Sequence, residues 1–301
     1  MNWQKKGLII TPQKRLWWMQ THAFVPTIYH VEGSIYRIYF SGRDNKNISH
    51  IGYAEVDFNN PFAVLEYSQE PVLTTGELGC FDDNGVTPSC IVDYEDKTYM
   101  YYIGWNKTSR VRMSLVTGLA ISDDKGKTFT RYSKAPLLGR TNHEPYNILT
   151  GPSVMVDDSR WRMWYVSCIG WVNEDLPMYN IKYAESNDGI NWNRKGIVCI
   201  DFKSLDEHSL ARPYVIKENE KYKMWYSYKG SNYRIGYSES NNGINWERMD
   251  DKVGIDVSKN GFDSEMIEFA NVIFHNESKY MIYSGNNYGI EGVGLAICEN
   301  G

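Results

Sequence analysis

One pattern recurs along the whole chain at a period of about 60 residues, and it restricts the fold more than any other feature. Each copy begins with a short apolar run, passes a polar turn, and continues as an alternating aromatic segment such as 161–167. Alternation with period two is typical of β-strands. In most copies a proline begins the first run, where a strand tolerates the missing N–H. The anchor residues are Pro26, Pro88, Pro152, Pro213 and, in place of a fifth proline, Asn271.

A second motif recurs between the later strands of each copy. Residues 186–192 read Ser-Asn-Asp-Gly-Ile-Asn-Trp, residues 240–246 repeat them almost unchanged, and 122–129 is a version with one extra residue. An Asp-Gly pair between alternating segments indicates a β-hairpin, because a type I′ turn needs positive φ at both central residues. The sequence therefore predicts a hairpin in each copy.

A unit of four strands repeated at this period is typical of a propeller blade. We therefore expect an all-β, five-bladed β-propeller with four antiparallel strands in each blade and one domain over 1–301. The chain stops inside the last hairpin motif at Asn300-Gly301, and Met1-Asn2-Trp3 continues that motif. The N-terminal strand should then complete the last blade and close the ring. The predicted blades are about 22–75, 82–139, 144–201, 207–257, and 263–301 together with 1–11.

Charge and cysteine content exclude several classes of partner. The net charge is −5 and no run of Lys or Arg occurs, so we expect no nucleic-acid partner. The five cysteines lack metal-ligand spacing and are expected to be buried free thiols, and we expect no metal and no cofactor. No stretch approaches the roughly 20 apolar residues of a membrane span, and no signal peptide is evident. We expect a cytoplasmic protein without membrane insertion and leave its oligomeric state open.

The strand order predicts which loops share a rim. The first and third strands of every blade should start, and the second should end, at one rim, while the Asp-Gly hairpins lie at the other. Propeller strands converge on a central channel, so the first rim is the expected site and the hairpins are structural. Carboxylates and aromatic rings gathered there suit glycosidic chemistry, because one carboxyl acts as acid, another as base or nucleophile, and rings stack on sugars.

The predicted catalytic residues are carboxylates on the loops that lead into the first strands. Asp83 also fits an Asx-turn, Glu144 also fits a solvated loop, and Glu207 with His208 also fits a loop salt bridge. Glu265 and Glu268 share one loop, and the sequence does not say which faces the funnel. The predicted catalytic set is Asp83, Glu144, Glu207 and Glu265. The predicted substrate-binding set is His22, Arg43, Asp82, Trp105, His143, Tyr146, His208, Arg212, Lys229, Glu268 and Asn286.

The repeat, the proline anchors and the Asp-Gly-x-x-Trp hairpins resemble those of the five-bladed propeller glycosidases, which include glycoside hydrolase families 43, 32, 68 and 130. In family 43 the first-blade motif is His-Asp-Pro with the Asp as general base, and this chain has Phe24-Val25-Pro26 there. Thr87, Gly151 and Arg212 precede the later anchors, so the family's Asp residues do not carry over by position. The chain also resembles glycosidase-like propellers found among bacterial surface-polysaccharide genes, which implies a sugar partner.

Three functional hypotheses follow. The first is a carbohydrate-active enzyme that acts at the anomeric centre of a sugar, oligosaccharide or nucleotide sugar, with Glu144 as acid and Asp83 or Glu207 as base. The second is a non-catalytic sugar-binding propeller, favoured by the missing first-blade Asp. The third is a nucleotide-sugar transferring or isomerising enzyme, favoured by the basic residues Arg43, Lys229 and Arg212 as phosphate partners.

Overall fold

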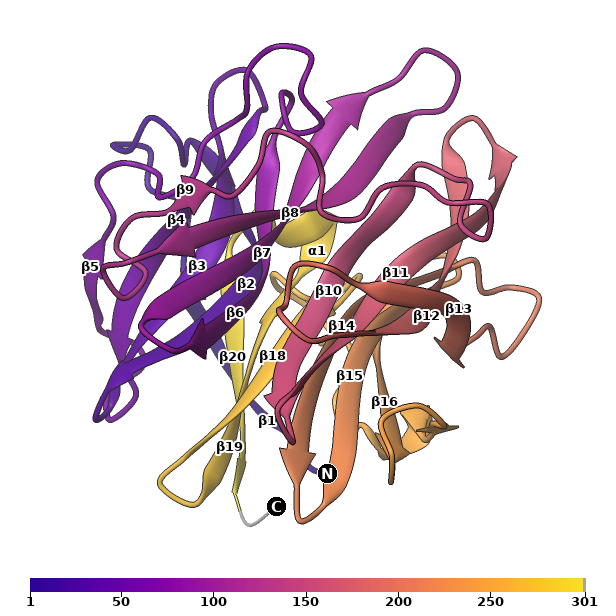
Figure 1. The fold of residues 1–301 in the computed structure, drawn as a ribbon. Helices are drawn as coiled ribbons and strands as arrows, with labels where there is room; N and C mark the ends of the chain where they lie inside the picture. Colours follow the sequence, from indigo (N-terminus) through magenta and orange to yellow (C-terminus); the bar gives the residue numbers. More distant parts are fainter. Residues whose placement is uncertain (300–301) are drawn as a thin grey trace.

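A computed structural model describes residues 1–299, and its ribbon is built almost entirely from β-strands (Figure 1). The described helical segments are one turn of α-helix, α1 (Asn286–Gly289), and one 3₁₀ turn, η1 (Asp250–Lys252). The all-β prediction is confirmed. Asn300 and Gly301, predicted to share a hairpin with the N-terminus, lie outside the described residues. Within residues 1–299 no helix has the length and apolar character needed to cross a membrane.

Two of the three sheets have four strands each. One has the order β2-β3-β4-β5, and the other has the order β1-β20-β19-β18. The N-terminal strand β1 pairs antiparallel with the C-terminal strand β20, with Gln4 opposite Ile297, as the sequence predicted. The strands are β1 (Gln4–Ile10), β2 (Thr21–Glu32), β3 (Ile35–Arg43), β4 (Ser49–Asp57), β5 (Val64–Tyr67), β18 (Glu268–His275), β19 (Ser278–Ser284) and β20 (Val293–Glu299).

The third sheet has 12 strands, and two short parallel pairings divide it into antiparallel runs. Ile148 of β10 lies opposite Leu115 of β8, and Tyr179 of β12 lies opposite Ser209 of β14. Its strands are β6 (Val86–Tyr94), β7 (Lys97–Lys107), β8 (Met113–Ser122), β9 (Thr130–Arg131), β10 (Ile148–Asp157), β11 (Arg160–Asn173), β12 (Leu176–Ser186), β13 (Asn193–Ile200), β14 (Ser209–Glu218), β15 (Lys221–Lys229), β16 (Tyr233–Ser240) and β17 (Glu247–Arg248).

The five strands that contain the anchor positions surround a common centre. They contact one another in the order β2, β6, β10, β14 and β18, and β18 contacts β2 in turn. Side chains join the neighbours: Val215 donates its backbone N–H to the Ser153 hydroxyl at 3.0 Å. Ile28 donates to the Asn271 amide oxygen at 3.2 Å, which links the last of these strands to the first. The strand starts are thereby held around one central space.

A backbone irregularity recurs at the anchors and determines which side chains face this centre. The pairing register shifts there in β2, β10, β14 and β18. In β18 the residue at the proline position is Ala270, so the prediction that Asn271 stands there is wrong by one residue. Without a proline, only the irregular backbone marks this position. In these four strands the residue before the anchor position has a left-handed φ: 52° at Val25, 59° at Gly151, 51° at Arg212 and 57° at Phe269, whereas Thr87 before Pro88 does not.

The hairpins at 186–192 and 240–246 differ from the predicted type I′ turn, whereas Lys125 and Gly126 in the 122–129 copy both have the predicted positive φ. Only Gly189 has positive φ, at 71°, whereas Asp188 does not. The Asp188 carboxylate instead accepts hydrogen bonds from the backbone N–H groups of Ile190 at 2.9 Å and Asn191 at 2.7 Å. These side-chain hydrogen bonds close a longer loop than a type I′ turn. Gly189 C=O accepts the Tyr101 hydroxyl at 2.8 Å from the preceding run of strands. The hairpins therefore fasten neighbouring parts of the fold together.

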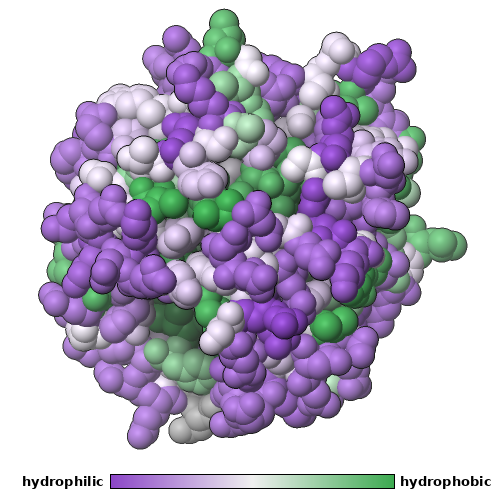
Figure 2. Space-filling model, viewed as in Figure 1, coloured by the Kyte–Doolittle hydropathy of each residue, from purple (hydrophilic) through white to green (hydrophobic). Residues whose placement is uncertain are grey.

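Aromatic side chains fill the space between neighbouring runs of strands. Trp161 packs with Tyr101 and Met163, and Trp225 packs with Tyr237 and Met281. Polar residues cover most of the surface in the view of Figure 2, and apolar residues emerge there in separate areas. The rigid core consequently supports the loops at both rims.

Candidate functional site

A cavity of about 260 Å³ lies where the anchor strands begin. The residues before the anchors, Val25, Thr87, Gly151, Arg212 and Phe269, all line it. It is also lined by residues near the ends of β3 and β7, by Val166 in the middle of β11, and by residues near the starts of β8, β12 and β16. This is the rim on which the sequence placed the site. Left-handed backbone is costly for a β-branched residue such as Val25, and such strain persists where the surrounding structure enforces it.

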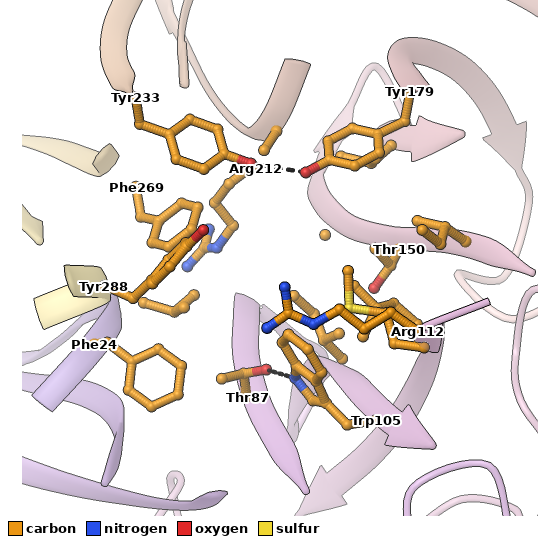
Figure 3. A pocket seen from close by; sticks show the side chains of 18 of the residues that line it. Phe24, Thr87, Trp105, Arg112, Thr150, Tyr179, Arg212, Tyr233, Phe269 and Tyr288 are labelled. Carbon is orange, nitrogen blue, oxygen red and sulfur yellow. Dashed lines mark hydrogen bonds between the residues drawn. The ribbon is translucent and has the colours of Figure 1, made fainter. Parts of the chain in front are cut away.

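Six aromatic rings line the cavity (Figure 3). The Tyr179 and Tyr233 hydroxyls bond to each other at 2.7 Å. Trp105 donates its indole N–H to the Thr87 hydroxyl at 2.8 Å, which fixes the ring on the opposite side. Rings held in this way offer stacking surfaces to an apolar sugar face. The aromatic lining residues are Phe24, Trp105, Tyr179, Tyr233, Phe269 and Tyr288.

Arg212 is the most deeply buried charge in the cavity wall. It is 2% exposed, and its Nη2 donates to Pro26 C=O at 3.0 Å and to the Thr27 hydroxyl at 2.6 Å. Its Nε and Nη1 are buried without a hydrogen-bond partner. Burial lowers the pKa of the guanidinium to about 10, so it remains charged at neutral pH. A buried charge with free donors is costly unless a ligand supplies acceptors.

Two further arginines reach the cavity, Arg43 from the end of β3 and Arg112 from the segment just before β8. Arg43 lies over the Phe24 ring at 5.0 Å and donates to the Asn47 side chain at 3.1 Å. Burial lowers the pKa of Arg43, and the positive charge of Arg112 lowers it further. Figure 3 shows the guanidinium groups of Arg112 and Arg212 inside the ring of aromatic side chains. Arg43, Arg112 and Arg212 form no ion pair with any described residue.

Carboxylates are missing from this lining: no Asp or Glu of residues 1–299 is among the residues that form the cavity wall. Glu268 lies directly before the lining residue Phe269 but is fully buried, and neither of its oxygens has a hydrogen-bond partner. Burial raises the pKa of Glu268 well above its ordinary value, and the charge of Lys229 opposes this only in part. Burial also raises the pKa of Tyr233, and the nearby Tyr179 and Glu268 add to that effect. A buried carboxyl group without a hydrogen-bond partner thus adjoins a lining residue of this wall, and its burial favours the protonated form.

The predicted catalytic carboxylates make other contacts. Glu144 is 1% exposed and accepts from the Tyr165 hydroxyl at 2.8 Å and from Arg194 at 2.7 Å. Glu207 accepts two hydrogen bonds from Arg248, at 2.8 and 3.0 Å. Asp83 accepts from the Gly79 N–H and from the Asn106 amide, both inside its own run of strands. Glu265 is exposed. None of the four lines the cavity, and their catalytic role stays a prediction.

The contacts of Glu144 recur elsewhere in the chain, where a buried carboxylate binds both a tyrosine hydroxyl and a cationic side chain. Asp82 accepts from the Tyr102 hydroxyl at 2.9 Å and from Arg131 at 2.8 Å. The same role is taken by Asp263, which accepts from Tyr283 at 2.9 Å and pairs with Lys5 at 2.7 Å. Glu144 with Tyr165 and Arg194 is the version in the middle of the chain. Because these contacts recur, we infer that each loop carboxylate holds its loop against the strand that carries the cation.

The predicted substrate-binding residues divide into two groups. Arg43, Trp105 and Arg212 line the cavity. Burial and then the charge of Arg43 lower the pKa of His22 to about 4, and this side chain lies outside the lining. The Asn286 amide is used internally, because it bonds to the backbone of Glu265 and Gly261. Outside the lining also lie Asp82, His143, Tyr146, His208, Lys229, Glu268 and Asn286.

Sequence reasoning missed several lining residues. Tyr179 and Tyr233 begin third strands, which the predicted rim already included, so their position was a usable signal. Arg112 lies on the loop before β8 and Tyr288 lies on α1, and the repeat gave no alignment for either segment. In the part of the chain that the structure describes, no three His, Cys, Asp or Glu side chains are grouped to hold a metal ion.

Comparison with known proteins gives close sequence relatives of full length. No protein-family model matches the chain. It is 39% identical over 302 residues to "Uncharacterized protein Rv1502" of Mycobacterium tuberculosis strain H37Rv, with 100% of both chains covered. Identity and coverage are the same for "Uncharacterized protein MT1551" of strain CDC 1551.

Solved structures with a similar fold include several glycosidases. A glycoside hydrolase has a TM-score of 0.76 and 19% identity, with 99% of this chain and 91% of that protein covered. A thermostable family-43 glycoside hydrolase has a TM-score of 0.66 and 18% identity, with 92% and 89% covered. A protein of the GH130 family has a TM-score of 0.70 and 15% identity, with 97% and 91% covered. The chain therefore has the propeller glycosidase fold.

Proposed function

The chain belongs to the family of the uncharacterized mycobacterial protein Rv1502, and from this and its propeller glycosidase fold we propose that it binds an anionic sugar in the central cavity and acts at its anomeric carbon. We read the three sheets as five four-stranded blades of one domain over 1–301, with β1 completing the last blade. In this reading the cavity is the mouth of the central channel, where propellers hold their ligands.

The observation that carries the proposal is the composition of the cavity wall. Arg43, Arg112 and Arg212 line it without a carboxylate partner among the described residues, next to six aromatic rings. The rings suit the apolar face of a sugar, and the guanidinium groups suit a carboxylate or phosphate, which they bind through paired hydrogen bonds. A neutral sugar would leave these charges unmatched. An anionic sugar matches both parts of the wall.

Glu268 is the group that we assign as proton donor. A general acid must be protonated at the working pH, and burial shifts the pKa of Glu268 in the direction that favours this form. Tyr288, whose hydroxyl accepts from Lys229 at 3.3 Å, has a left-handed backbone and lies beside Phe269, the residue that follows Glu268, in Figure 3. The step would require substrate to reach Glu268 past this wall. Glu144 with Asp83 or Glu207 is the alternative pair, which would require those carboxylates to leave their present partners.

A non-catalytic sugar-binding propeller is the second candidate. It is favoured by the absence of an Asp or Glu from the described cavity lining and by Val25, which stands where family 43 has its base. Both candidates bind the same ligand, and only the enzyme converts it to product.

One experiment separates them. The protein is titrated calorimetrically with a panel of neutral methyl glycosides and uronic acid glycosides, and the mixtures are then analysed by mass spectrometry. Binding with release of free sugar supports the enzyme, and its loss in Glu268→Gln with retained binding supports the assigned acid. Binding without product supports the second candidate. If neither anionic nor neutral sugars bind, the proposed function is wrong.

A further inference from the structure

A second hollow, of about 410 Å³, adjoins the central cavity. Phe24, Arg43, Trp105, Arg112 and Met113 line both spaces, so they are two parts of one continuous site. The hollow extends outward between the end of β3 and the end of β7. Its composition differs from that of the cavity, because it is lined mainly by polar and basic side chains.

Four cations face this hollow: Arg43, Lys46, Lys107 and Arg112. None of them forms an ion pair with another described residue. No described Asp or Glu lines the hollow. This concentration of positive charge does not follow from composition, since the chain as a whole carries a net charge of −5.

The nearby acidic side chains are turned to other partners. Asp44 accepts the backbone N–H groups of Lys46 and Ile48, both at 2.9 Å. Asp83 accepts from the Asn106 amide at 2.8 Å, which holds the Asn106 side chain at the wall of the hollow. A multiply charged anion bound in the hollow would interact favourably with all four cations.

We propose that this hollow is a phosphate subsite and that the ligand of the central cavity is a sugar linked at its anomeric carbon to a phosphate or diphosphate. The proposal rests on the proposed function, because it takes the central cavity as the sugar site. A single carboxylate would be matched by one guanidinium. Four cations in a polar hollow instead match the two or more charges of a diphosphate, and the shared lining lets one ligand occupy both spaces.

The test uses a double variant that leaves the central cavity intact. Lys46→Ala with Lys107→Ala removes two cations that line only the hollow. Lys127→Ala with Lys195→Ala is the matched control, because both lysines are exposed, lie outside the hollow and have no ion pair among the described residues. Binding of inorganic phosphate, inorganic pyrophosphate, glucose 1-phosphate and UDP-glucose is measured calorimetrically at two salt concentrations.

We expect pyrophosphate to bind the wild type, to bind the Lys46/Lys107 variant at least tenfold more weakly, and to bind the control unchanged. A larger loss for UDP-glucose than for glucose 1-phosphate would identify a nucleoside diphosphate sugar, and equal losses would identify a sugar phosphate. Equal pyrophosphate affinity in both double variants, or no phosphate binding at all, would overturn the subsite. If uronic acid glycosides still bind the wild type in that case, only the subsite fails and the proposed function stands.

Discussion

The Arg212 guanidinium bonds to the Thr27 hydroxyl at 2.6 Å although 185 residues separate them in the sequence. The contact joins β14 to β2 across the floor of the central cavity. It uses only one nitrogen of the guanidinium, and Nε and Nη1 are left without a partner. Arg212 is thus both a link between distant strands and a donor for a ligand.

These two roles are separated by Arg212→Met. Methionine keeps the length of the side chain and removes a buried charge, so the free energy of unfolding should change by less than about 2 kcal/mol. The affinity for an anionic sugar should fall about 10- to 100-fold, because a charged hydrogen bond contributes about 1.5–3 kcal/mol. Denaturant unfolding and calorimetric titration measure the two effects, with the exposed Arg15→Met as charge control. Unchanged affinity in Arg212→Met would contradict the role in binding.

Glu144→Gln tests whether this carboxylate is structural. Its partners Arg194 and Tyr165 would be left with a neutral amide, and breaking a buried ion pair costs about 3–5 kcal/mol. We expect a clear loss of stability in chemical denaturation and unchanged ligand affinity at a temperature where the variant is folded. The double variant Glu144→Gln, Arg194→Met should recover part of that loss. A stable variant with normal binding and no turnover would instead support a catalytic Glu144.

Gly189→Ala tests the hairpin contact between neighbouring runs of strands. An added Cβ would lie 2.8 Å from both the Tyr101 hydroxyl and the Trp161 ring. Gly196 has nearly the same φ, 72° against 71°, but nothing lies within 4 Å of its added Cβ, so Gly196→Ala is the control for backbone strain. The control should lose about 1 kcal/mol and Gly189→Ala about 1–3 kcal/mol more. Equal melting temperatures for both variants would show that the contact contributes nothing.

Glu268 should make stability depend on pH. Its pKa is raised in the folded protein, so above the unfolded value of about 4.3 the unfolded chain releases a proton that the folded protein keeps. Stability from this group is therefore complete below that pH and falls as pH rises, by at most about 1.4 kcal/mol per unit. Glu268→Gln should lack this decline, so its advantage over the wild type in denaturant unfolding should grow from pH 5 to pH 8. A constant difference across that range would show that Glu268 is already ionised.

The sequence repeat by itself is enough to predict much of the fold. The alternating aromatic segments predicted strands such as β11 and β15, because a period of two is a local property of the chain. The match between the two ends of the sequence predicted the pairing of β1 with β20, since both carried parts of one motif. The turn type of 186–192 was less accessible, because the Asp188 side chain, and not the backbone alone, closes that loop.

The site depended on tertiary contacts that the sequence does not encode locally. Repeat position alone brought Arg212 and Trp105 to the rim, but the partners of each loop carboxylate come from other strands, as with Glu144 and Arg194 of β13. Only packing places Glu144 in an ion pair. Packing also leaves Arg212, Arg43 and Arg112 around one cavity without a carboxylate partner among the described residues. The sequence by itself determined the strands and their order, because these follow from local periodicity. The tertiary structure decided which charges are paired, because pairing depends on distances between residues far apart in the chain.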